Sequence, residues 1–432
     1  MKQEFFKYVS RNVAGMLGIS AYLLADTFFI SLYSGANGIT VLNLALPIYG
    51  LIFAIGAMIG IGSATSYAIK KAQGVKNIDS YFTHSLLWQV IFSIPFMLLG
   101  LLASERLLVL MGADQTIATL GKSYLQIALM ASPFFMGNFT FTAFVRNDNA
   151  PNTAMVAAII SSLFNIIFDY IFMFPLNLGL TGAALATGVS PVISIFICSL
   201  HYKSKKSSLK IKFRVPSLKL LLSCCKLGVS AFVGEISSAI TTAVFNALIL
   251  SSTGNVGVAA YGIVANLSLI AMSIFNGLSQ GMQPLLSKCY GQGKVKDLKY
   301  LLKLGVIVCL IFEGIIILTS WGFTNQLVNI FNSEQNTQLA KYAHSALRLY
   351  FLGYSFAGIN ILLVTYFSAT YKAIRAMVAS LLRGAVAIVV CAIVMNALWG
   401  LNGVWLSFLG AEVITFFVAI FLLRYKGDKY EL

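Results

Sequence analysis

The chain has 432 residues, of which 58% are hydrophobic and only 10% are charged. A soluble domain carries about 25% charged residues, so this composition excludes an ordinary soluble protein and indicates a chain that crosses a membrane many times. The formal net charge is +16, and its distribution decides whether it indicates nucleic-acid binding. The six cysteines have no metal-binding spacing, and no disulfide framework is expected from them.

Apolar runs long enough to span a bilayer recur along the chain. A spanning helix needs about 20 mostly apolar residues. Twelve such helices are expected, near residues 13–33, 41–69, 82–103, 123–145, 153–174, 180–200, 220–250, 256–287, 300–320, 340–367, 376–397 and 401–423. We expect the first to be retained, because Asp26 interrupts the apolar core that a signal peptide needs. The predicted fold class is an all-α polytopic membrane protein.

The positive charges alternate between the expected loops. Lys and Arg gather before the first helix, after every second helix and at the C-terminus, whereas the loops after helices 1, 5, 7 and 11 carry no charge. This is the positive-inside pattern, which predicts both termini in the cytoplasm. Because topology and contact with anionic lipids account for the charge, we expect the lipid bilayer and no nucleic acid as a partner.

An internal repeat divides the chain into two halves. Matching glycines recur at a constant offset of 219 residues: Gly15 with Gly234, Gly35 with Gly254, and Gly62 with Gly281. Further on, "GLTGAALATGVSPVIS" matches "GLNGVWLSFLGAEVIT". We therefore expect two homologous six-helix lobes, at residues 1–200 and 218–432, joined by a basic cytoplasmic linker at 201–217. Transporters built from such repeats bind their substrate between the halves, near the middle of the membrane.

Acidic residues inside the expected spans indicate a functional site. There are five of them: Asp26, Asp169, Glu235, Glu313 and Glu412. An ionised carboxylate costs about 2.5–3.5 kcal/mol at the centre of a spanning helix, so such groups normally face the interior and are protonated or paired.

Two of these carboxylates have a polar neighbour one helical turn earlier, Tyr22 before Asp26 and Asn165 before Asp169. The two pairs predict one shared site. The repeat aligns both aspartates with apolar residues of the second half, so this site belongs to the N-terminal lobe.

Four stretches carry a family resemblance. They are "ADTFFISLYSGANGITVLNLALPIYGL", "FVRNDNAPNTAM", "NIIFDYIFMFPLNLGLTGAALAT" and "GLSQGMQPLLSKCYGQGK". In this order, and with this repeat, they resemble the multidrug and toxic compound extrusion (MATE) family over essentially the whole chain. The segment "GVSAFVGEISSAI" in helix 7 resembles the bacterial branch with a glutamate at the position of Glu235. The sodium-coupled branch holds its glutamate about one turn later, where this chain has Ser238.

The resemblance implies a monomeric multidrug antiporter of the bacterial cytoplasmic membrane, with two six-helix lobes in a V. It would export amphipathic, cationic small molecules by alternating access, with a proton or sodium ion as the coupling ion and no other cofactor. Carried over residue by residue, the ion-coupling site would comprise Tyr22, Asp26, Asn165, Asp169 and Thr187. Sodium would be held by Asp26, Asn165, Asp169 and Thr187. The candidate substrate-cavity residues are Glu235, Asn246, Gln280, Gln283 and Glu412.

Other classes of function fit the residues less well. An enzyme is not expected, because the three histidines are scattered and HExxH does not occur. A primary pump would need a GxxxxGK[ST] motif, which is absent. The rival function is a lipid-linked oligosaccharide flippase of the same superfamily. Its cavity would be cationic to hold phosphate, whereas the charges in mid-membrane are acidic here. The coupling ion and the roles of Glu313 and Glu412 remain open.

Overall fold

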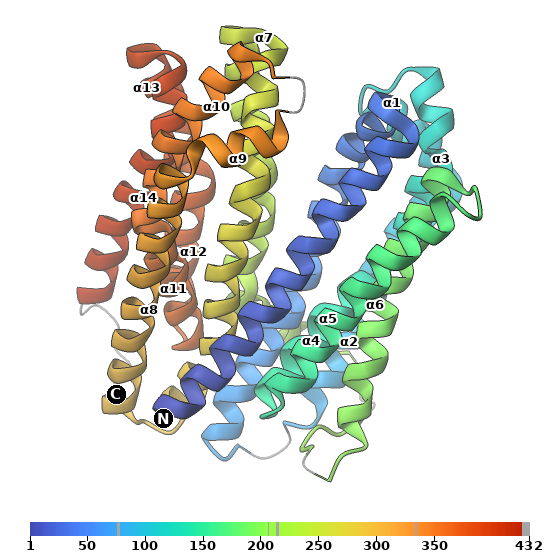
Figure 1. Cartoon of the computed structure of the whole chain (residues 1–432). Coiled ribbons are helices and arrows are strands. Elements are labelled where there is room, and N and C mark those ends of the chain that lie inside the picture. Colours follow the sequence, from blue (N-terminus) through green and yellow to red (C-terminus); the bar gives the residue numbers. More distant parts are fainter. Residues whose placement is uncertain (76–77, 206, 213–215, 333–334, 426–432) are drawn as a thin grey trace.

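The computed structural model describes residues 1–432 apart from 76–77, 206, 213–215, 333–334 and 426–432, and Figure 1 shows two lobes of long helices. The first lobe consists of α1 (Lys2–Ala72), α2 (Ser80–Leu110), α3 (Gln115–Met130), α4 (Ser132–Asn147), α5 (Pro151–Met173) and α6 (Gly179–Tyr202). The second consists of α7 (Leu218–Gly291), α8 (Val295–Gly322), α9 (Thr324–Phe331), α10 (Thr337–Tyr350), η1 (Phe351–Gly353), α11 (Tyr354–Ala369), α12 (Ala373–Leu381), η2 (Leu382–Val386), α13 (Ala387–Trp399) and α14 (Leu401–Arg424). No strand occurs among the described residues.

The helices supply twelve membrane spans. Ten helical segments of the described chain are long and apolar enough to cross a bilayer, and the bent pair of α3 and α4 makes an eleventh. Helix α7 has 74 residues, which is about 110 Å of helix against a hydrocarbon core of about 30 Å. It is broken at Gly254, so it contains two spans and completes the twelve.

Two glycines make the reversals inside α1 and α7. Gly35 has φ +56° and Gly254 has φ +68°, and residues other than glycine rarely adopt such a positive φ. The uncharged loops expected after helices 1 and 7 are therefore single-residue breaks in otherwise helical chain. Since both glycines belong to the repeat at 219 residues, the repeat preserves the positions where the chain turns.

Three expected single helices are interrupted, and in the span expected at 340–367 the interruption is η1, a 3-10 turn between α10 and α11. The span expected at 123–145 is the pair α3 and α4, bent by 41°. Pro133 lies at the start of α4, where it cannot donate a hydrogen bond to the preceding turn. The span expected at 376–397 contains η2, a turn of π-helix. Single π turns inside α-helices occur frequently at functional sites.

The two lobes contact each other near the end of the molecule that holds the N-terminus and the α6–α7 connection, and they diverge toward the other end (Figure 1). Glycines allow the backbones to approach closely there, because a Cβ at Gly228 would collide with Met58 and one at Gly277 with Val13. The start of α1 also packs into the hydrophobic core of the second lobe through Phe5. The lobes are thus closed at one end and apart at the other.

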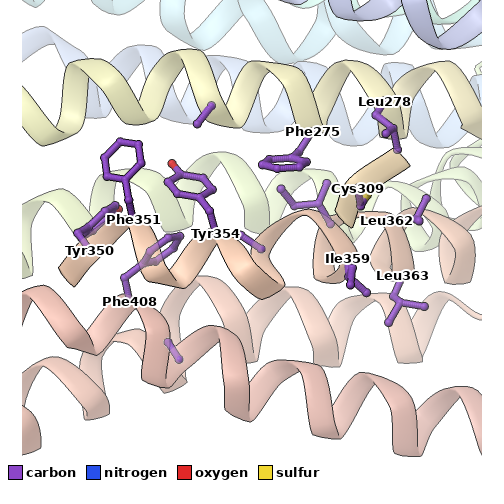
Figure 2. Packing of buried hydrophobic residues seen from close by; sticks show 14 of the residues in the cluster. Phe275, Leu278, Cys309, Tyr350, Phe351, Tyr354, Ile359, Leu362, Leu363 and Phe408 are labelled. Carbon is purple, nitrogen blue, oxygen red and sulfur yellow. The ribbon is translucent and has the colours of Figure 1, made fainter. Parts of the chain in front are cut away.

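The core of the second lobe is rich in aromatic side chains (Figure 2). Tyr350 stacks on Phe408 of α14 with ring centroids 4.5 Å apart, and Tyr354 of α11 stacks on Phe275 of α7 at 6.1 Å. These rings join the four helices α7, α10, α11 and α14 by apolar contact. Polar groups in this lobe must therefore find their partners inside an aromatic and aliphatic interior.

Candidate functional site

The expected ion site lies inside the first lobe, where three helices meet. The first half of α1 supplies Tyr22 and Asp26, α5 supplies Asn165 and Asp169, and α6 supplies Thr187. Asn165 and Asp169 are fully buried, and Asp26 is 6% exposed. The two carboxylates lie within electrostatic reach of each other, and Tyr22 lies within reach of both. The structure thus brings together residues that are about 140 positions apart in the sequence.

The buried oxygens of this cluster outnumber the hydrogen-bond donors that reach them. The side-chain amide of Asn165 donates to the hydroxyl of Thr187 at 3.1 Å. Among the described residues, four buried oxygens of the cluster meet no donor: Oδ1 of Asp26, Oδ1 of Asn165 and both carboxylate oxygens of Asp169. A buried acceptor without a partner is destabilising. A hard cation would satisfy carboxylate, amide and hydroxyl oxygens at once, and a proton on one carboxyl would bridge the aspartates. The residues present therefore fit either a small cation or a proton.

Two tyrosines beside the cluster were not predicted from the sequence. Tyr49 lies in the second half of α1 and Tyr124 in α3, and both are buried within electrostatic reach of Asp26 and Asp169. Their rings are 6.5 Å apart. Phenolic hydroxyls inside apolar spans are the signal that could have identified them, but the sequence does not show which helix faces which.

The candidate cavity residues fall into different environments. Glu235 and Asn246 are half-buried on α7, in its first half. Gln280 and Gln283 lie in its second half, where α7 meets the other lobe, and both bind residues of that lobe. An Nη1 nitrogen of Arg146 donates to Gln280 and, at 3.1 Å, to Asn12.

Gln283 is the most connected of these side chains. It accepts a hydrogen bond from Asn147 at 2.9 Å and donates to Thr65 at 3.0 Å, both across the lobe contact. It also donates to Ser287 on its own helix at 3.0 Å. In this conformation Gln283 therefore holds the closed ends of the lobes together, and the assignment of both glutamines to a substrate cavity stays a prediction.

Glu412 lies in the interior of the second lobe. It is 1% exposed and forms an ion pair with Arg383 at 2.7 Å. Asn360 donates to its other carboxylate oxygen at 2.7 Å. The sequence indicates the carboxylate but not the arginine, because Arg383 lies 29 residues away on another helix. Its assignment to a substrate cavity also stays a prediction.

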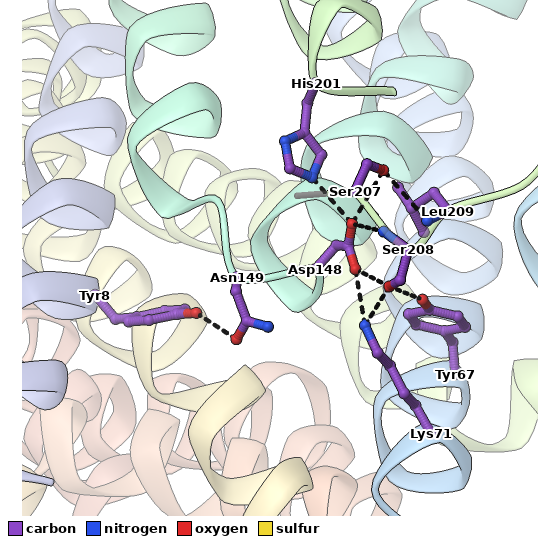
Figure 3. Close-up of polar contacts among 9 residues, drawn as sticks. All are labelled: Tyr8, Tyr67, Lys71, Asp148, Asn149, His201, Ser207, Ser208 and Leu209. Atoms are coloured by element: carbon purple, nitrogen blue, oxygen red, sulfur yellow. Dashed lines mark hydrogen bonds and ion pairs between the residues drawn. The ribbon is translucent and has the colours of Figure 1, made fainter. Parts of the chain in front are cut away.

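A second polar cluster fixes the segment that follows α6 to the first lobe (Figure 3). The carboxylate of Asp148 binds Lys71 at 2.8 Å, the ring of His201 at 3.0 Å and the backbone N–H of Ser208 at 2.9 Å. Burial would raise the pKa of the Asp148 carboxyl, but the hydrogen bonds from Lys71 and Ser208 outweigh it and hold this pKa below its usual range. Asp148 therefore stays ionised and anchors the segment.

Two six-helix lobes with a buried acidic cluster in one of them define a two-lobed membrane transporter. The chain belongs to the MATE family, because the family model MatE matches residues 13–171 and 230–394. The resemblance seen in the sequence is thereby confirmed. Members of this family are transporters and not enzymes.

Curated relatives agree over nearly the whole chain. The multidrug export protein MepA of Staphylococcus saprophyticus is 28% identical over 426 residues, covering 95% of this chain and 92% of its own length. MepA of Staphylococcus aureus is 29% identical over 424 residues, covering 94% and 90%.

Solved structures confirm the predicted fold of two six-helix lobes. A multidrug resistance MATE family transporter of the MOP superfamily, in an outward-facing conformation, superimposes with a TM-score of 0.91 at 21% identity, covering 98% of this chain and 95% of that one. A MATE structure in a bent conformation gives a TM-score of 0.87, also at 21% identity and covering 98% and 94%. At this identity the likeness establishes the fold alone.

Proposed function

We propose that this protein is a multidrug efflux antiporter of the bacterial plasma membrane. It exports amphipathic, cationic small molecules in exchange for protons or sodium ions by alternating access, and it works as a monomer with both termini in the cytoplasm. The observation that carries the proposal is the set of buried oxygens around Asp26 and Asp169 that meet no donor. The relatives named as multidrug export proteins support the drug-export part.

Coupling follows from the state of the acidic pair. A cation or proton in the cluster removes buried charge, and its departure restores that charge, so occupancy favours one packing of the first lobe over another. Substrate that binds the two packings with different affinity is then linked to the ion, because the coupling free energy is reciprocal. The location of the cluster between helices α1, α5 and α6 lets the ion bias the lobe as a whole.

The flippase alternative receives less support. A phosphate-bearing lipid needs cationic groups within the spans, but two carboxylates of the first lobe cluster there, and Arg383 in the second lobe is paired with Glu412. The curated relatives reported above are named for multidrug export. Cationic cargo therefore agrees better with the charges of the described residues.

Asp169→Asn tests the proposal. We expect the variant to fold and to reach the membrane at near-normal levels, because the amide preserves the shape and removes the charge that must be compensated. It should retain drug binding but lose most of its gradient-driven export, roughly 10-fold or more, which corresponds to ~1.4 kcal/mol of lost coupling. Asp26→Asn should behave in the same way. The measurement is transport of a fluorescent cation by vesicles under separately imposed proton and sodium gradients, beside direct binding to the purified protein.

The matched control is Glu4→Gln, which removes an exposed carboxylate outside the cluster and should export normally. The gradient that drives the wild-type protein identifies the coupling ion. Normal export by Asp169→Asn under both gradients would show that the carboxylate is structural, and the coupling model would then be abandoned.

A further inference from the structure

The second lobe contains its own group of buried charged side chains, separate from the acidic pair of the first lobe. It comprises Glu313 on α8, Asn360 on α11, Arg383 on η2 and Glu412 on α14. Glu313 is 2% exposed, Glu412 is 1% exposed and Asn360 is fully buried. Four different elements therefore direct polar groups into one apolar interior, which a merely structural role would not require.

Glu412 is fully compensated. Arg383 donates through Nε to one of its carboxylate oxygens and Asn360 donates to the other, both at 2.7 Å. Arg383 lies in the π turn of Leu382–Val386, a local widening that changes the direction of side chains relative to a regular helix. The single positive charge of Arg383 is therefore neutralised by the carboxylate of Glu412.

Glu313 is not compensated. Its Oε1 accepts a hydrogen bond from the backbone N–H of Ile359 at 3.2 Å, but Oε2 is buried and meets no donor among the described residues. Gly358 makes room for this carboxyl, since a Cβ there would lie 2.8 Å from Oε1 and would also collide with Phe275. Because Ile359 is next to Asn360, the two carboxyl groups are attached to the same turn of α11.

The charges of this group do not cancel. Two carboxylates and one guanidinium leave one negative charge, and a buried carboxylate without a counter-charge is far less stable than the neutral acid. Glu412 and the thiol of Cys309, one turn earlier on α8, lie within electrostatic reach of Glu313, and Arg383 and the phenol of Tyr354 lie beyond, within reach of Glu412. On the side of Gly358 and Glu313, α7 presents Phe275, which carries no charge.

We infer that Glu313 is a proton-binding site of the second lobe, which exchanges its proton with water by way of the neighbouring Glu412–Arg383 pair and titrates independently of the Asp26/Asp169 pair. Arg383 supports this route, because its side chain is 18% exposed whereas that of Glu412 is 1% exposed. Protonation of Glu313 removes the one negative charge of the group. The η2 turn that carries Arg383 is irregular, so it is the element that can change its conformation when this charge is removed. The inference depends on the fold of the second lobe and not on drug export.

Infrared difference spectroscopy on the purified full-length protein tests this inference. The background variant Asp26→Asn/Asp169→Asn/Glu235→Gln leaves Glu313 and Glu412 as the acidic residues of the expected spans. We expect this background to keep the C=O band of a protonated, buried carboxylic acid, and the band should disappear reversibly as the pH is raised. Adding Glu313→Gln should abolish the band, and adding Glu313→Asp instead should keep an acid but shift its frequency.

Each outcome decides the question. Absence of the band from the background variant would overturn the inference, and so would a band that neither substitution at Glu313 alters. A band that does not titrate while the protein stays monodisperse would show a permanently neutral acid and would overturn the exchange. Because no transport is measured, failure here is distinct from failure of the proposed antiport.

Discussion

The carboxylate of Asp148 shows how one residue joins segments that are far apart in the sequence. It binds Lys71 at the end of α1, His201 at the end of α6 and Ser208 in the connection to α7 (Figure 3). The motif "FVRNDNAPNTAM" contributed to the family resemblance, but nothing in it predicts these partners. They are 53 to 77 residues away, and only the folded lobe brings them together.

Asp148→Asn should loosen the segment after α6. The amide cannot replace an ionised acceptor for Lys71 and Ser208, and a hydrogen bond to a charged group contributes about 1.5–3 kcal/mol. We expect faster trypsin cleavage at Lys210 and a lower thermal unfolding midpoint in detergent. The control is Asp79→Asn, which also removes an ion pair to this segment, with Lys212, but at an exposed position where such pairs contribute about 0–1 kcal/mol.

The same carboxylate gives a pH dependence with a defined sign. Because the pKa of Asp148 is lower in the folded protein than in the unfolded chain, its stabilising contribution is complete above the unfolded pKa of about 4. The contribution is lost as the pH falls through the lower folded pKa. The difference in unfolding midpoint between wild type and Asp148→Asn should therefore be full at neutral pH and shrink in acid. A constant difference would contradict the assignment.

At the scale of the element, the turns of α1 and α7 depend on glycine. Gly35→Ala should destabilise the protein by about 1–2 kcal/mol, because a side chain at φ +56° is strained even where there is space around it. Gly314→Ala is the matched control, since this glycine lies inside α8 with open space and no positive φ, and alanine favours a helix there. Thermal unfolding of both variants in detergent measures the difference. Equal midpoints would show that the break at Gly35 needs no glycine.

The positions of the helices were predictable from the sequence, but only some of the breaks within them were. Apolar runs of sufficient length predicted the spans, because the bilayer requires that length of every helix. Pro133 and Gly35 could have indicated the breaks they cause. The π turn at Leu382–Val386 contains no proline, and the partner of its Arg383 is Glu412 on α14, 29 residues away.

At the scale of the molecule, the hydrogen bonds of Gln283 stabilise contact between the lobes at one end. Gln283→Leu removes bonds to Asn147 and Thr65 and leaves their polar groups buried without this partner, so it should shift the protein away from the observed conformation. Spin labels at Leu176 and Trp399, which are exposed on different lobes, should report a shorter distance in a cysteine-free background. Ser287→Ala removes only a bond within α7 and should leave the distance unchanged.

Membrane topology is a second property of the whole molecule. The alternating basic loops predict the α6–α7 connection in the cytoplasm and the turn of α1 outside. A cysteine at Lys210 should therefore react only after the membrane is permeabilised, and a cysteine at Asn37 should react with an impermeant reagent in intact cells. Both positions are exposed in the structure. External labelling at position 210 would contradict the twelve-span arrangement.

The sequence alone determined the class of this protein. Hydropathy, loop charge and the repeat can each be read along the sequence. The membrane requires the same length of apolar helix from every span, so the spans, the lobes and the acidic residues inside them were predictable without coordinates. Tertiary structure alone decided which of these acidic residues have partners. Asp26 meets Asp169, Glu412 meets Arg383, and Glu313 is left with an unsatisfied oxygen. The physical reason is that periodicity specifies the buried face of a helix, whereas the packing of one helix on another selects the residue that faces it.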